Sequence, residues 1–88
     1  MQILFERNFS RDLKKIKDKR VLKRVSDAIA EAEEATSLKG LTNLKKLEGF
    51  STYYRIRVGN YRIGIEVSEG KIIFVRVLNR KEIYRYFP

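Results

Sequence analysis

The stretch that decides the fold is TYYRIRVGNYRIGIEVSEGKIIFVRVL, residues 52–78. Two dipeptides divide it into three segments, Gly59-Asn60 and Glu69-Gly70, and each is typical of a two-residue hairpin turn. The segments are rich in β-branched and aromatic residues, which favour strands. We therefore predict an antiparallel meander of three strands, over residues 52–58, 61–67 and 71–78.

The alternation of polar and apolar residues predicts which side chains share a face of the sheet, because successive side chains of a strand point to opposite sides. In the first strand, Arg55 and Arg57 fall on one face and three apolar side chains fall on the other. In the second strand, Arg62 is predicted to point away from the core. The third strand is apolar on both faces, with one set of Ile73, Val75 and Val77 and an opposite set of Ile72, Phe74, Arg76 and Leu78.

The N-terminal residues predict a strand followed by a short helix. Residues 2–6 alternate as a strand does, and Ser10 is a suitable N-cap for a helix over residues 11–17. Asp12 then falls in the first turn, where a carboxylate complements the helix dipole.

A second helix is predicted over residues 19–37, with Asp18 as its cap. Its apolar residues recur at spacings of three and four, as in an amphipathic helix: Val21, Leu22, Val25, Ala28, Ile29, Ala32 and Ala35. Residues 38–49 are predicted to be a connection whose leucines lie under the sheet.

We therefore expect one α+β domain over residues 1–88. Two N-terminal helices pack on a four-stranded, mainly antiparallel twisted sheet, in the order β-α-α-β-β-β. A short C-terminal tail follows, either a single helical turn or an extended segment.

Composition narrows the classes of function. The 88 residues include 20 Lys and Arg against 11 Asp and Glu, a net charge of +9, which predicts a polyanionic partner. The chain has no cysteine and no histidine, so disulfides, Cys/His zinc sites and His-based nucleophilic dyads are excluded. No apolar run approaches the ~20 residues of a membrane span and no secretory signal is present, so we expect a soluble cytoplasmic protein.

The arginines are the main candidates for a site. Arg55, Arg57 and Arg62 lie on the predicted solvent face, and Arg80 follows the last strand, so all four can converge on one strip. Clustered guanidinium groups repel one another unless an anion lies between them, and their planar forks suit phosphate oxygens. The alternative is that these arginines only place charge on an exposed edge or face and so suppress aggregation. Because there are four of them on one face, we favour anion binding.

RNA cleavage does not require histidine. The 2′-hydroxyl of RNA is itself the nucleophile, so an enzyme can act by aligning it and by stabilising the charged phosphorane. Arginine cannot transfer the protons, because it stays protonated. Composition and spacing do not choose among the groups that can: Tyr84, Tyr86, Lys81, Glu48 and Glu82.

Three segments carry a resemblance to a known family. They are Leu47-Glu48-Gly49 ahead of the meander, Arg55 to Ile63 within the pattern Tyr-Arg-x-Arg-x-Gly-x-Tyr-Arg, and Arg80 to Arg85 as Arg-x-x-Ile-Tyr-Arg. Together with the order of elements, they resemble the RelE/ParE toxin superfamily over essentially the whole chain.

The resemblance implies the toxin of a type II toxin–antitoxin pair. Its RelE-like branch consists of ribosome-dependent, metal-independent endoribonucleases that need no cofactor and leave a 2′,3′-cyclic phosphate and a 5′-hydroxyl. A cognate antitoxin, the ribosome and mRNA are then the partners, and we expect the free toxin to be a monomer. The implied catalytic residues are Arg62, Arg80 and Tyr84, and the implied RNA-binding residues are Arg55, Arg57, Lys45, Lys46, Arg85 and Tyr86.

Two other functions stay open. ParE-like members share the fold and inhibit DNA gyrase, and a member without catalysis would be an antitoxin-binding or nucleic-acid-binding module. Arg55 and Arg57 stand where some RelE-type members have lysine, and Asn79 stands where many have histidine. These differences concern proton transfer more than substrate binding.

Overall fold

The computed structural model describes all 88 residues as an α+β domain with a five-stranded sheet. The elements in chain order are β1 (Gln2–Phe5), α1 (Arg7–Lys14), α2 (Lys19–Glu34), the 3₁₀ turn η1 (Leu38–Gly40), β2 (Leu44–Lys46), β3 (Tyr53–Val58), β4 (Tyr61–Ser68), β5 (Lys71–Asn79) and α3 (Ile83–Tyr86). The predicted fold class and the predicted antiparallel meander, β3 to β5, are confirmed.

The sheet has the order β1-β5-β4-β3-β2, with β1 parallel to β5 and every other pair antiparallel. The prediction of four strands was wrong by one. Residues 44–46 form the edge strand β2 against β3, with Lys45 opposite Arg55. Three residues are too few to show a period of two, so the pairing with β3 defines this strand more than its own pattern does.

Three helix boundaries also differ from the prediction. Helix α1 spans Arg7–Lys14 rather than 11–17, and its N-cap, Glu6, makes no side-chain capping bond. The buried ring of Phe9 lies in the first turn and packs against Phe5 and Phe74, with ring centroids 5.8 and 5.4 Å away. Tertiary packing thus outweighs the capping preference of Ser10. Helix α2 ends at Glu34 rather than 37, whereas its predicted cap is confirmed: Asp18 accepts a hydrogen bond from Arg20 N at 2.9 Å.

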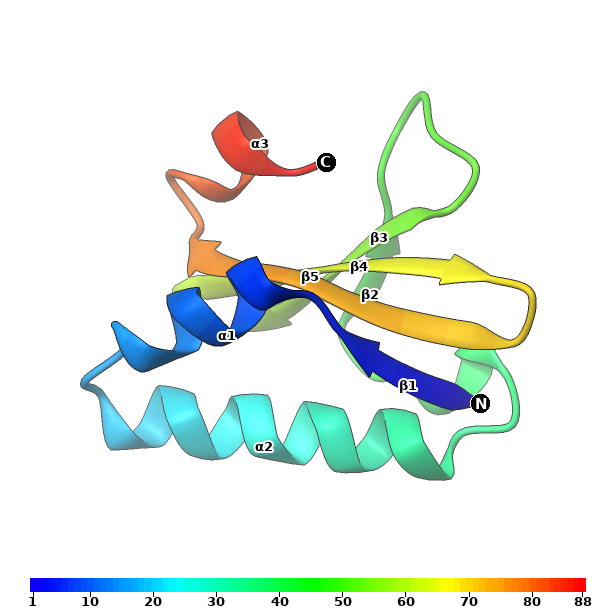
Figure 1. The fold of residues 1–88 in the computed structure, drawn as a ribbon, viewed down its shortest axis with the longest axis horizontal. Coiled ribbons are helices and arrows are strands. Elements are labelled where there is room, and N and C mark those ends of the chain that lie inside the picture. Colours follow the sequence, from blue (N-terminus) through cyan, green and yellow to red (C-terminus); the bar gives the residue numbers. More distant parts are fainter.

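Both long helices cover the same face of the sheet (Figure 1). The side chains between them and the strands form the main core: Phe9, Ile16, Val21, Val25, Ala32, Ala35, Leu41, Ile56, Val58, Ile63, Ile65, Ile72, Phe74 and Val77. On the opposite face, Figure 1 shows α3 (red) and the loop between β2 and β3 (green) rising from the sheet. That face is therefore available for a site.

A bulge in β5 changes the predicted faces of this strand. Ile63 pairs with Val77 and Ile65 pairs with Phe74, so the register shifts and Val75 is the extra residue. Val77 consequently joins Ile72 and Phe74 in the core instead of sharing a face with Ile73 and Val75. A strand that is apolar on both faces gives no sequence signal for such a shift. None of the helices combines the length and the apolar character that crossing a membrane would take.

Candidate functional site

Arg57 and Arg62 lie directly opposite each other across β3 and β4. Arg55 lies two residues along the same face, opposite Gly64. Residues that pair across a sheet point to the same side, so all three arginines lie on the face that α1 and α2 leave uncovered. Because β3 and β4 are inner strands, these charges do not protect a sheet edge from aggregation.

Arg80 is tied to the same corner through the backbone. Its N–H donates to the carbonyl oxygen of Asn60 at 2.8 Å, which holds the end of β5 against the Gly59-Asn60 turn. Arg62 is fixed to that turn as well, because its Nη1 donates to the carbonyl oxygens of Gly59 at 2.9 Å and Tyr61 at 3.0 Å.

The pKa of Arg62 is shifted by burial and by the charged groups near it. Burial lowers the pKa of Arg62, and the nearby cation Arg55 lowers it further; the phenol of Tyr84 raises this pKa, and Arg57 and Arg80 lower it. A guanidinium still keeps its proton at neutral pH. The four arginines, called the arginine cluster from here on, therefore form a region of concentrated positive charge with Tyr84 beside it.

No carboxylate neutralises the arginine cluster. The two salt bridges of the chain join Lys23 to Asp27 and Arg76 to Asp12. Arg55 donates through Nη1 to the carbonyl oxygen of Asn43 at 3.3 Å, and its buried Nε has no partner. Neighbouring like charges without a counter-charge favour a bound anion.

A cleft of about 540 Å³ adjoins the cluster, and its lining residues come from β2, the β2–β3 loop, β3 and the C-terminal segment. Its lining residues are Lys45, Lys46, Leu47, Glu48, Phe50, Arg55, Tyr84, Phe87 and Pro88. Lys45 pairs with Arg55 and shares its face. Lys46 pairs with Tyr54, whose face is the opposite one, so Lys46 borders the cleft without joining the arginine face.

The structure separates the two candidate tyrosines. Tyr84 lines the cleft beside Arg55 and is 60% exposed. Tyr86 lies on the other side of α3, where its ring centroid is 5.6 Å from the guanidinium carbon of Arg76. Of the predicted residues, the structure thus brings Tyr84 to the arginine cluster and places Tyr86 away from it, while Arg85 is exposed on the same helical turn.

Asp12 is the main polar residue whose position the sequence did not predict. It lies in the second half of α1, 5% exposed, and not in the first turn. It accepts hydrogen bonds from Nε and Nη2 of Arg76 at 2.7 and 3.0 Å and from Val77 N at 3.1 Å. Strand β1 ends opposite Phe74, so it does not reach Val77. The carboxylate of Asp12 accepts the hydrogen bond of this backbone N–H of β5 in place of a neighbouring strand. Arg76 is therefore paired and does not belong to the cluster.

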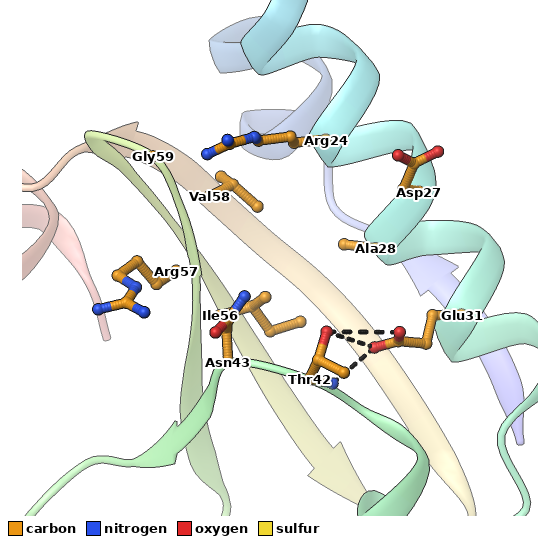
Figure 2. A pocket seen from close by; sticks show the side chains of 10 residues that line it. All are labelled: Arg24, Asp27, Ala28, Glu31, Thr42, Asn43, Ile56, Arg57, Val58 and Gly59. Atoms are coloured by element: carbon orange, nitrogen blue, oxygen red, sulfur yellow. Dashed lines mark hydrogen bonds between the residues drawn. The ribbon is translucent and has the colours of Figure 1, made fainter.

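A second groove of about 480 Å³ lies between α2 and β3 (Figure 2). Glu31 bridges this region, since its carboxylate accepts from Thr42 N at 2.6 Å and from the hydroxyl at 3.2 Å. Figure 2 shows Arg57 pointing away from α2, whereas Arg24 extends toward Gly59. Because its lining mixes acidic and basic side chains, this groove lacks the concentrated positive charge of the arginine face.

Comparison with known proteins identifies the family. Residues 3–84 match the family model described as the ParE toxin of type II toxin–antitoxin systems, parDE. The chain is 51% identical over 89 residues to Toxin RelE3 of Methanocaldococcus jannaschii, and the match covers 100% of both proteins. The chain belongs to the RelE/ParE toxin superfamily. The resemblance inferred from its residues is thereby confirmed, as is the functional class, a toxin of type II toxin–antitoxin systems.

Solved structures of RelE/ParE proteins agree with the fold. The chain is 47% identical to one in the RelB-RelE antitoxin–toxin complex from Methanococcus jannaschii, with a TM-score of 0.80 over 97% of this chain and 99% of the other. The archaeal RelE-RelB complex from Pyrococcus horikoshii OT3 contains a chain 20% identical, with a TM-score of 0.72 over 90% and 93%. At that identity the similarity concerns the fold alone.

Proposed function

We propose that this toxin is a metal-independent endoribonuclease that cuts mRNA on the ribosome. The observation that carries the proposal is the arginine cluster: three cations on one sheet face and a fourth, Arg80, at the adjoining end of β5 have no carboxylate partner, and Tyr84 lies beside them. An RNA phosphodiester supplies the missing negative charge, and guanidinium forks match its oxygens in geometry.

The reaction follows from the chemistry of RNA. The 2′-oxygen attacks the adjacent phosphorus and forms the P–O bond of a 2′,3′-cyclic phosphate, while the bond to the 5′-oxygen breaks and leaves a 5′-hydroxyl. The phosphorane in between carries extra negative charge, which Arg62 and Arg80 stabilise from fixed positions. Arg55 and Arg57 hold the neighbouring phosphates, and Lys45 extends this contact along β2.

The positions of the titratable groups narrow the choice for the two proton transfers. Tyr84 and Glu48 line the same cleft as Arg55. Tyr86 and Glu82 line a separate cavity together with Asp12 and Arg76. We assign the proton transfers to the first pair: Glu48 accepts the proton of the 2′-hydroxyl, and Tyr84 donates a proton to the departing 5′-oxygen.

The partners in this proposal are programmed ribosomes and a cognate antitoxin. RelE proteins occur in the solved structures as complexes with RelB antitoxins. For this chain we propose an antitoxin with an acidic, amphipathic segment that complements the charge of +9. Activity on ribosomes would place the toxin in the cytoplasm.

Cell-free translation with purified toxin tests the proposal. We expect mRNA to be cut only when ribosomes are present, and we expect Arg62→Ala to abolish most of the cutting. A matched control is Arg11→Ala, which removes an exposed arginine of α1 outside the cluster. mRNA that stays intact in a translating extract to which folded toxin has been added would contradict the proposal.

Inhibition of DNA gyrase is the second candidate, because the matching family model is described as that of ParE toxins. It predicts arrested supercoiling with intact mRNA. The same preparation can be assayed with gyrase and relaxed plasmid, so the two functions give opposite results in one experiment.

A further inference from the structure

The C-terminal turn α3 is held by buried side chains at its two ends, with exposed side chains between them. Ile83 and Phe87 are 0% and 2% exposed, whereas Tyr84 and Tyr86 are 60% and 50% exposed. A single helical turn does not persist on its own. The position of the exposed Tyr84 therefore depends on what its buried neighbours contact.

Phe87 is held by a gap in the sheet at Gly64. Gly64 lies in the middle of β4 on the arginine face, between Arg55 on β3 and Arg76 on β5. A Cβ atom at this position would stand 2.6–2.7 Å from three ring carbons of Phe87, a separation that real Cβ atoms do not show. The ring of Phe87 occupies the space that any other side chain would need, and Tyr53 closes it edge-on at 5.6 Å.

The other side of α3 has a contact of its own. Tyr86 lies over Arg76, and Asp12 fixes that guanidinium through two hydrogen bonds. This contact limits the rotation of α3 about its axis. It does not fix the distance between α3 and the sheet, which depends on Phe87. The packing of the Phe87 ring on Gly64, called the seat of Phe87 from here on, thus sets how closely Tyr84 approaches the arginine cluster.

We propose that Gly64 and Phe87 are positioning residues for RNA cleavage, because the seat of Phe87 on Gly64 places the Tyr84 hydroxyl at the arginine cluster. This inference rests on the proposed function. It assigns a role to a glycine, which has no side chain, and to an aromatic ring, and both act through the position of Tyr84. Misplacing a catalytic group by about 1 Å costs about 100-fold in rate.

The experiment is a double-mutant cycle in the full chain: Gly64→Ala, Phe87→Ala and the two together. Ser68→Ala is the matched control, since Ser68 lies on the same strand and the same face, at the far end of β4. Cleavage of ribosome-bound mRNA is measured over a range of ribosome concentrations, which separates kcat from KM. Hydrogen exchange of α3 is measured in the free protein, where Phe87 N–H donates to the carbonyl oxygen of Ile83 at 2.8 Å.

We expect Gly64→Ala to lower kcat about 100-fold with KM unchanged, because the arginines that bind RNA stay in place. Phe87→Ala should lower kcat comparably. In the Phe87→Ala background, Gly64→Ala should add no further loss, because the ring that it would strike is gone. Exchange at the end of α3 should speed up in all three variants and stay slow in Ser68→Ala.

Wild-type kcat in Gly64→Ala, or losses that multiply in the double variant, would overturn the positioning role. Protected α3 amides in Gly64→Ala would overturn the seat itself. If the wild-type toxin cuts no mRNA, the proposed function fails and the positioning role fails with it, while the exchange measurement still supports or overturns the seat.

Discussion

Asp12→Ala should be among the most destabilising single substitutions in this toxin. Asp12 is 5% exposed, and its carboxylate accepts three hydrogen bonds, two from Arg76 at 2.7 and 3.0 Å and one from Val77 N at 3.1 Å. Removing one member of a buried pair leaves the other charge unpaired, at a cost of about 3–5 kcal/mol. The side chain of Arg76 is 20% exposed, so water recovers part of this cost, and we expect about 3 kcal/mol.

That loss is a large share of the total for a domain of this size, since whole domains have about 5–15 kcal/mol of unfolding free energy. At about 4–8 °C per kcal/mol, the Tm should fall by about 12–24 °C. Thermal and urea unfolding of purified toxin, followed by circular dichroism, measures both quantities. Asp12→Asn should lose less, because the amide oxygen can still accept from Val77 N.

The matched control is Asp27→Ala. Lys23 and Asp27 form a salt bridge at 3.2 Å on the surface of α2, with side chains 76% and 63% exposed. Such a helix pair contributes only about 0.3–0.5 kcal/mol. A loss in Asp12→Ala no larger than in Asp27→Ala would refute the argument that burial makes the pair with Arg76 important.

Three further predictions concern the candidate site. Arg62→Ala should lower mRNA cleavage about 100- to 1000-fold, the usual cost of one transition-state donor, and relieve growth arrest while antitoxin still binds; growth that stays arrested would speak against this site. Arg57→Gln should raise the stability of the free toxin in low salt, because Arg57 faces Arg62 without a carboxylate, and the gain should shrink as salt is added; unchanged urea midpoints would show that the cluster is not strained. Tyr84→Phe should slow cleavage more than Tyr86→Phe, measured at saturating ribosomes, since only Tyr84 lies at the cluster; equal effects would disagree with the observed direction of α3.

Local patterns were sufficient for the meander and for the arginine face. The Gly59-Asn60 and Glu69-Gly70 turns fix where the strands begin and end, and a period of two then places Arg55, Arg57 and Arg62 on one side. Strand β2 and the start of α1 were not predictable in this way. Both depend on contacts with distant residues: β2 on pairing with β3, and α1 on the packing of Phe9 against Phe74.

The parts of the site that sequence did not predict depend on contacts between residues far apart in the chain. The Phe87 ring packs on Gly64, and a glycine inside a strand gives no sign of which ring it accommodates. Asp12 and Arg76 lie 64 residues apart, so no spacing rule joins them. The bulge at Val75 was hidden because β5 is apolar on both faces.

The most direct measurement maps the ends of mRNA in a purified translation system with and without the toxin. If the arginine cluster holds and cleaves an RNA phosphodiester, new fragments should appear only with programmed ribosomes, with a 2′,3′-cyclic phosphate on one side of the cut and a 5′-hydroxyl on the other. Arg62→Ala should remove them. Full-length mRNA in the presence of wild-type toxin, together with arrested supercoiling by gyrase, would contradict the account.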